Sequence, residues 1–405
     1  MSGGGEVEAA AESLLVPNGP PPAPPAVGME VRRQVGLAAP LVACSLLQYS
    51  LQVVSVMFAG HLGELSLSGA SVASSFANVT GFSVLLGMGS ALDTFCGQSY
   101  GAKQFGMLGT HTQRAIFVLM LMGVPLAFVL AFAGQILISL GQNPEISTEA
   151  GLYALWLIPG IFAYGLLQCL TKFLQTQNIV HPLVVCSGVT LVLHILLCWV
   201  MIHCFDLGNR GFLPNPKLET SILSISLNTM WMVYTIPSGF SSAISIRVSN
   251  ELGAGNPQGA RLSVFISGIM CLTEGMLVAI ITVLVRDTWG YLYSNEEEVV
   301  KYVATMMPIL AISDFMDGIQ CTLSGAARGC GWQKICSVIN LCAYYTIGIP
   351  SAIIFAFVLK IGGKGLWLGI ICAMTVQILA LVVMLLRTSW KEEAEKAQAR
   401  VQGSD

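Results

Sequence analysis

Four carboxylic acids lie inside long apolar stretches of this sequence: Asp93, Glu274, Asp314 and Asp317. An ionisable side chain in such surroundings is costly to bury, so each acid is a candidate functional residue. Asp314 and Asp317 are three positions apart and therefore share one face of a helix. Desolvation and the like charge of the neighbour both disfavour ionisation of one of the two. A carboxyl group in that state can take up and release a proton, so we predict Asp317 and Asp314 as proton-coupling or cation sites.

Other polar residues in the apolar stretches are candidates for a substrate cavity. Gln52 lies one turn beyond Gln48, and Glu274 lies in the middle of its stretch without an obvious charged partner. We predict that a cavity is lined by Gln48, Gln52, Asn78 and Glu274. The alternative is that they bond to neighbouring helices, as polar residues in membrane spans commonly do. Asp93 lies near the end of its stretch, where we expect a structural or gating role.

Several other chemistries lack the residues that they need. The five His residues are scattered, the twelve Cys residues show neither zinc-ligand spacing nor a disulfide pattern, and no Walker-type loop is present. We therefore expect no cofactor, no metal site and no direct ATP drive, with a proton or sodium gradient as the energy source. An intramembrane enzyme with Asp314 and Asp317 as paired catalytic carboxylates is a remote alternative, because no nucleophile accompanies them. No basic block suggests nucleic acid.

The composition indicates the kind of scaffold that holds these residues. Of the 405 residues, 54% are apolar and 10% are Asp, Glu, Lys or Arg, whereas a soluble domain carries about 25% charged residues. Apolar runs of about 20 residues, long enough to cross a bilayer, occur at residues 35–60, 66–92, 115–140, 151–174, 182–204, 220–243, 262–285, 302–324, 335–358 and 365–387. A large soluble helical protein would show charged stripes at helical spacing, which these runs lack. We predict an all-α polytopic membrane protein with about ten transmembrane helices.

The runs divide the chain into four parts. Residues 1–33 are rich in Pro and Gly and are predicted to form a disordered cytoplasmic tail. Residues 34–211 and residues 212–388 each form a lobe of five helices, and residues 389–405 form a second cytoplasmic tail. With the N-terminus inside, the inner segments hold thirteen of the 19 Lys and Arg residues. Such an excess is typical of cytoplasmic segments, so we predict that both termini are cytoplasmic.

An internal repeat relates the two lobes. Residues 87–92 match residues 239–244, and Gly101-Ala102 match Gly253-Ala254, all at one offset of 152 residues. Both Gly-Ala elements fall on the same side of the predicted topology, so the two halves are inserted the same way up. Parallel repeats of this kind are typical of transporters, which place their substrate between the halves.

The same segments resemble the paired signatures of a known family. Residues 96–102 (CGQSYGA) and 247–257 (RVSNELGAGNP) are similar to those of multidrug and toxic compound extrusion (MATE) transporters, and the second is close to the plant DETOXIFICATION form. Further motifs in the family's order lie at residues 47–63, 173–178, 293–298 and 327–333. We interpret the signatures as loops that build a gate, with the candidate residues Gly97, Gln98, Gly101, Ala102, Arg247, Asn250, Glu251 and Gly253. Arg247 and Glu251 are four positions apart and are expected to pair.

The resemblance implies a transport activity and a membrane location. Members of the family are secondary active antiporters that export small organic compounds or xenobiotics, in plants in exchange for protons. Asp317 aligns with the acid of the family's tenth helix. The resemblance further implies a multi-pass protein of the plasma membrane or the vacuolar membrane.

The chain departs from the family pattern at one point. Family members have twelve helices in two lobes of six, whereas ten are predicted here. At Gly211–Phe212 the sequence passes from the segment before the family's sixth helix to the segment after its seventh. The seventh helix of the family supplies carboxylates to the cation cavity, and no position here matches them. The alternative function is therefore an inactive or regulatory splice isoform that associates with the full-length protein.

Overall fold

A computed structural model describes residues 26–60, 64–204, 218–289, 291 and 297–402. In these residues the fold is helical and contains no strand. The π-helical segments are η1 (Asn78–Phe82), η4 (Ala343–Gly348) and η5 (Ile354–Val358). The α-helices are α2 (Val27–Gly60), α3 (Glu64–Ala77), α4 (Ser83–Gly89), α5 (Ala91–Gly101), α6 (Phe105–Ala131), α7 (Ala133–Ser139), α8 (Pro144–Thr176), α9 (His181–Cys204), α10 (Leu218–Gly253), α11 (Pro257–Leu284), α12 (Arg286–Trp289), α13 (Glu297–Cys330), α14 (Gln333–Cys342), α15 (Ile349–Ile353), α16 (Gly363–Leu386) and α17 (Trp390–Gln402).

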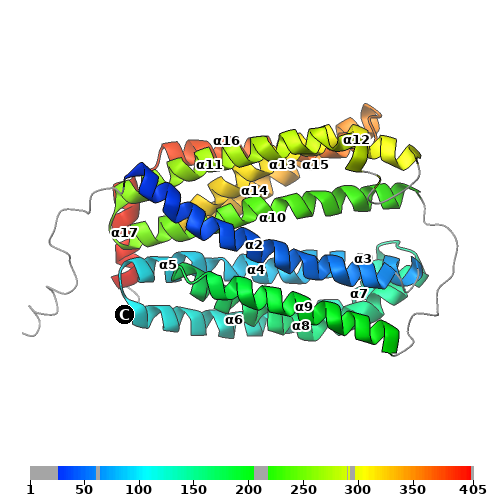
Figure 1. The fold of residues 1–405 in the computed structure, drawn as a ribbon, viewed down its shortest axis with the longest axis horizontal. Coiled ribbons are helices and arrows are strands. Elements are labelled where there is room, and N and C mark those ends of the chain that lie inside the picture. Colours follow the sequence, from blue (N-terminus) through cyan, green and yellow to red (C-terminus); the bar gives the residue numbers. More distant parts are fainter. Residues whose placement is uncertain (1–25, 61–63, 205–217, 290, 292–296, 403–405) are drawn as a thin grey trace, which may run out of the picture.

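The helices run side by side as an elongated bundle (Figure 1), and the chain is a helical polytopic membrane protein. Each of the ten predicted apolar runs coincides largely with a helix or a continuous series of helices. Within the described residues, seven stretches are long and apolar enough to cross a membrane, and His181–Leu197 is a shorter apolar helix. Helix α13 is not among the seven although it is 34 residues long. Its charged residues, which include Asp314 and Asp317, lower its mean hydropathy.

Two groups of helices each have a core of their own. Helices α3, α4, α5, α6 and α8 pack around fully buried side chains such as Leu85, Leu130 and Ile161. Helices α10, α11, α13 and α17 share a second core that includes Ile244 and Ala326. The first group lies within residues 34–211, and the second, apart from α17, lies within residues 212–388. Helix α2 crosses between them (Figure 1) and packs against both α9 and α10.

The lobes meet at one end of the bundle, which we name the signature end. Helices α5 and α10 end there, and α2, α11 and α17 begin there (Figure 1). Near this end Leu37, Ala38 and Leu41 of α2 form a buried cluster with Val180 of one lobe and Ile246 of the other. The contact between the lobes is therefore part of the hydrophobic core of the molecule.

Two predicted boundaries are corrected by the structure. The tail predicted at residues 1–33 is wrong from Val27 onward, because α2 begins there and Glu30 is fully buried. Residues 1–25 lie outside the described part of the chain. The predicted tail at 389–405 contains α17, which packs Ala394, Ala397 and Val401 into the protein. The composition of this segment does not indicate a packed helix, because its residues are mostly charged and only one face of the helix is apolar.

Helix irregularities accompany two of the prolines. Pro40 lies inside α2. Pro350 lies in the short helix α15, between the π-helical segments η4 and η5. A third π-helical segment, η1, begins at the candidate residue Asn78. Single π-helical turns are rare and occur frequently at functional sites.

Candidate functional site

Three acids from two helices form a cluster inside the C-terminal lobe. Asp314 and Asp317 lie on α13 and are 8% and 9% exposed, and Glu274 lies partly buried on α11. The charge of Asp314 interacts with those of both Asp317 and Glu274. A Cβ atom placed on Gly318, the neighbour of Asp317, would lie 4.0 Å from Oε2 of Glu274. We call Glu274, Asp314 and Asp317 the acid cluster.

The acid cluster contains a buried acceptor atom without a partner in the described part of the chain, and two phenol groups lie near it. Oδ2 of Asp314 is buried and has no hydrogen-bond partner among the described residues. Asp317 interacts electrostatically with the phenol groups of Tyr234 on α10 and Tyr344 on η4. A carboxyl group with a free buried oxygen can hold a proton or accept a bond from a cation, whereas leaving it ionised and unpartnered is costly. The arrangement is therefore suited to exchanging one positive charge for another.

The predicted cavity residues fall in different places. Gln48 is exposed on α2 and donates from Nε2 to Sγ of Cys44 at 3.5 Å. Asn78 is partly buried in η1, and its main-chain oxygen accepts a hydrogen bond from Ser83. The side chain of Gln52 lies outside the described part of the structure. No hydrogen bond of the described residues joins Gln48 or Asn78 to the acid cluster, so of these three described candidates Glu274 alone belongs to it.

The signature residues lie on helices, which corrects their prediction as loops. Gly97, Gln98 and Gly101 are in α5, and Ala102 caps its end. Arg247, Asn250, Glu251 and Gly253 form the last turns of α10. The two helices touch backbone to backbone: a Cβ atom on Gly101 would overlap the carbonyl oxygen of Asn250, and one on Gly253 would overlap that of Gln98. The glycines serve close approach of the two repeats rather than loop conformation.

Substituting one of these glycines should separate the helices. We expect Gly101→Ala to reduce the free energy of unfolding by about 1–3 kcal/mol, because the added methyl group has no room. Gly109→Ala is the matched control in α6, where an added Cβ atom has no neighbour within 4 Å. There the loss of a helical glycine should stabilise by about 0.5–1 kcal/mol. Thermal unfolding in detergent measures both, and shifts of the same sign would contradict the close contact.

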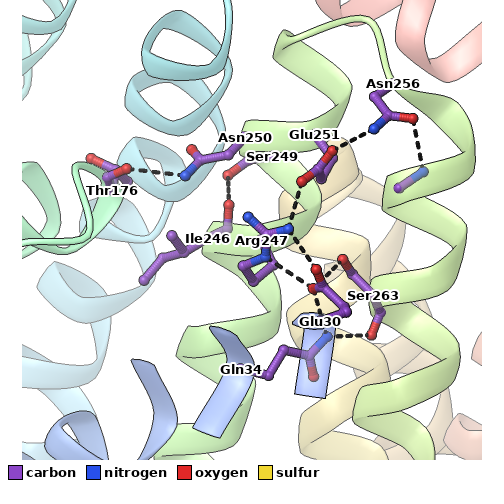
Figure 2. A network of polar contacts seen from close by, with 11 residues as sticks. Glu30, Gln34, Thr176, Ile246, Arg247, Ser249, Asn250, Glu251, Asn256 and Ser263 are labelled. Atoms are coloured by element: carbon purple, nitrogen blue, oxygen red, sulfur yellow. Dashed lines mark hydrogen bonds and ion pairs between the residues drawn. The ribbon is translucent and has the colours of Figure 1, made fainter. Parts of the chain in front are cut away.

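A buried ion-pair network ties α2 to the second signature (Figure 2). Glu30 accepts two hydrogen bonds from Arg247, from Nε at 3.0 Å and from Nη2 at 2.8 Å. Arg247 also pairs with Glu251, as predicted from their spacing. Ser263 of α11 donates to Glu30 at 2.8 Å, and so does Gln34 at 3.1 Å. The network therefore joins three helices at the signature end.

Further hydrogen bonds of the second signature reach the start of α11 and the other lobe. Asn256, before α11, donates from Nδ2 to Glu251 at 2.8 Å and caps α11 by accepting from the main chain of Gly259. Asn250 donates to the main-chain oxygen of Thr176 in α8 at 3.3 Å (Figure 2). Signature residues thus bond across the lobes as well as within one of them. This supports the interpretation of the signatures as the structure of a gate.

Asp93 of α5 is fully buried and has two basic partners, one of which lies in the other lobe. Its carboxylate pairs with Lys172 of α8 at 3.0 Å and lies 3.7 Å from Nε of Arg328 in α13. Thr94 adds a hydrogen bond to the main-chain oxygen of Arg328. Asp93 is thus bound at the junction of the lobes and lies outside the acid cluster, in agreement with a structural or gating role.

A chain of polar contacts connects this ion pair with the acid cluster. Arg328 donates from Nη2 to Oγ of Ser241 at 2.7 Å, and Ser241 bonds to the main-chain oxygen of Cys321. Sγ of Cys321 contacts the phenol oxygen of Tyr234 at 3.8 Å. Tyr234 interacts electrostatically with Asp317. These contacts therefore give a route by which a change of charge in the acid cluster can affect Arg328 at the lobe junction.

Helix α17 covers the signature end and touches both lobes. Arg400 donates from Nη1 to Oε1 of Gln98 at 3.2 Å and to the main-chain oxygen of Cys330 at 3.1 Å. Glu393 accepts a hydrogen bond from the indole of Trp332 at 3.2 Å. The pKa of Lys396 is raised, because its ammonium group donates a hydrogen bond to Glu393 and is attracted by that carboxylate. Sequence reasoning missed this helix as part of the lobe junction.

Comparison with known proteins identifies the architecture. A sequence model of the MatE family matches residues 40–200 and 213–354. Protein DETOXIFICATION 16 of Arabidopsis thaliana is 47% identical over 93% of this chain and 92% of its own length, and DETOXIFICATION 14 is 39% identical over 93% and 92%. The crystal structure of the eukaryotic MATE transporter AtDTX14 superposes with a TM-score of 0.87 at 38% identity, over 93% of this chain and 99% of that one.

The alignments also support an internal gap. The match to DETOXIFICATION 16 extends over 445 residues, whereas 93% of 405 residues is about 377, so on the order of 70 aligned residues have no counterpart here. At about 20 residues a crossing, the difference suffices for two transmembrane helices with their connections. The family match is interrupted at residues 201–212, where the deletion was predicted. The junction itself lies outside the described residues. With family signatures, fold and relatives in agreement, the chain belongs to the MATE family of multidrug and toxin efflux transporters.

Proposed function

We propose that the chain is a secondary antiporter that exports small organic compounds in exchange for protons. The observation that carries the proposal is the acid cluster, three acids from two helices in the interior of a membrane-spanning lobe. Burying an ionisable side chain within the membrane costs free energy, so acids in such positions commonly have a function. Binding of a cationic compound displaces a proton from the cluster, and proton uptake from the other side displaces the compound. No cofactor enters this cycle, because the gradient supplies the energy.

The contacts at the signature end support one step of this cycle. Glu30–Arg247, Asp93–Arg328 and the glycine contacts of α5 with α10 all join the lobes there. The same end carries most of the basic residues, including Arg32, Arg33 and those of α17. By the positive-inside rule we assign it to the cytoplasm, with both termini inside. The conformation is then closed toward the cytoplasm, and the membrane is the plasma membrane or the vacuolar membrane.

Transport can be measured in proteoliposomes that contain the purified chain. We expect a fluorescent organic cation to accumulate when a pH gradient is imposed, and accumulation to collapse when a protonophore is added. A sodium gradient of the same size at uniform pH is the matched condition, and we expect no accumulation from it. Sodium-driven accumulation would overturn proton coupling, and the absence of accumulation under either gradient would overturn transport by this chain.

The missing helix pair favours a second candidate function. We propose as the alternative that the chain is an inactive or regulatory splice isoform that associates with a full-length transporter. The gap corresponds to about 70 residues that the relatives possess, a length that is sufficient for two membrane crossings. Co-expression with a differently tagged full-length relative tests this. Stoichiometric co-purification with a chain that is inactive alone would support association, whereas a monodisperse, transporting chain would count against it.

A further inference from the structure

A basic groove at the signature end is not used by the transport mechanism. It has a volume of about 590 Å³ and lies between the first turns of α2, the connection from α8 to α9, and α10. Its lining consists of Met29, Arg32, Arg33, Gly36, Leu37, Asn178 and Arg247. None of these residues is acidic, so the groove has a positive charge. Its volume lies within the range of about 300–1,000 Å³ that is usual for small-ligand sites.

Two of the three arginines are available to a ligand. Arg247 is paired with Glu30 and Glu251, so its charge is neutralised within the protein. Arg32 and Arg33 are exposed, and no hydrogen bond or ion pair joins them to the described residues. Guanidinium groups bind phosphate oxygens through paired, charge-assisted hydrogen bonds. The space beside Gly36 is open, since an added Cβ atom there would meet nothing within 4 Å.

An apolar stripe runs along the same turns of α2. Val27, Val31 and Val35 follow one another at helical spacing and are 60%, 37% and 48% exposed. Arg32 and Gly36 are the next residues around the helix. A ligand that filled the groove with an anionic group would thus lay an attached apolar chain on this stripe. A free phosphate ester would use the arginines but not the valines.

From this juxtaposition we infer that the groove binds an anionic phospholipid, with its headgroup phosphate on Arg32 and Arg33 and an acyl chain along Val31 and Val35. Basic pockets between transmembrane helices on the cytoplasmic side are suited to such headgroups. Arg247 forms the inner wall of the groove, so the bound phosphate lies beside the Glu30–Arg247 ion pair. The lipid therefore occupies a position from which it stabilises the closed signature end.

Lipid binding can be tested without transport. The purified full chain is titrated in phosphatidylcholine micelles with phosphatidylinositol 4-phosphate, and the shift in its unfolding temperature gives an apparent affinity. We expect the Arg32→Gln/Arg33→Gln variant to bind at least about tenfold more weakly, with an unchanged unfolding temperature in lipid-free detergent. The matched control is Arg387→Gln/Lys391→Gln, two exposed basic residues outside the groove near the same end, which should bind as the unaltered chain does.

Three results would overturn the inference. Equal weakening in both double variants would show diffuse attraction to basic charge instead of a site. Undiminished binding by the Arg32→Gln/Arg33→Gln variant would place the lipid elsewhere. Soluble inositol 1,4-bisphosphate is the remaining arm: stabilisation as strong as that by the lipid would identify a free phosphate ester as the ligand. Because no gradient is applied in any arm, failure here is independent of failure in transport.

Discussion

Asp317→Asn is expected to abolish accumulation of an organic cation driven by a pH gradient, to the level of protein-free liposomes. The amide has nearly the shape of the carboxyl group but cannot exchange a proton, so the coupled step is lost while packing is kept. Asp317 is 9% exposed and interacts with Tyr234 and Tyr344. A neutral side chain there is also cheaper to bury than an ionised one. The chain should therefore unfold at an unchanged or higher temperature.

Two comparisons make this result specific. Asp314→Asn neutralises the neighbouring acid, whose Oδ2 has no partner among the described residues, so it should reduce transport without a loss of stability. Glu145→Gln, an exposed acid in the first turn of α8, should leave the transport rate unchanged. Initial rates in proteoliposomes measure all three variants. Retention of pH-driven accumulation by Asp317→Asn would remove the acid cluster from the coupling mechanism.

The acid pair was predictable because its evidence is local. Two acids three positions apart in an apolar run must share a helix face, whatever the rest of the fold does. Glu274 was found as a single polar residue, but its place beside Asp314 depends on the packing of α11 against α13. A single sequence contains no signal for that contact. The ten apolar runs were likewise predictable, since length and apolar composition are local properties.

Residues whose partners are distant in the sequence were missed. Glu30 follows a Pro-rich stretch, which predicts a disordered tail, and its partner Arg247 is 217 positions away in the sequence. The glycines of the signatures were assigned to loops because glycine favours turns, but the structure uses their small size where α5 meets α10. A faint signal for Glu30 existed in its spacing from Gln34, which is four positions on and bonds to it.

The polar chain from the acid cluster to the lobe junction suggests how the two cooperate. It runs from Asp317 through Tyr234, Cys321 and Ser241 to Arg328, which also faces Asp93 of the other lobe. Neutralising Asp317 changes the field at Tyr234 and so the balance of charges around Arg328. Coupling through this chain requires that both of its ends bias one equilibrium, the opening and closing of the lobe junction. Such coupling also requires that the contacts at the signature end contribute substantially to the free energy of unfolding.

We expect Arg247→Met to lower the free energy of unfolding by about 3–5 kcal/mol, which measures the contribution of the ion-pair network. The substitution removes the shared partner of Glu30 and Glu251, leaving a fully buried carboxylate without its counter-charge. Unpaired buried charges cost more than the pair contributes, because desolvation is no longer offset. Thermal and denaturant unfolding in mixed micelles give the change in the free energy of unfolding.

A double-mutant cycle separates this pair from a general effect of the substitution. Adding Glu30→Gln to Arg247→Met should recover a large part of the loss, since the stranded charge is then removed. Lys301→Met is the matched control, because Lys301 pairs with Glu297 at 2.9 Å where both side chains are 76% exposed. An exposed pair contributes about 0–1 kcal/mol. If Arg247→Met cost no more than Lys301→Met, the network could not hold the signature end closed, and the closure would have to come from the apolar contacts of α2 and the glycine contacts of α5 with α10.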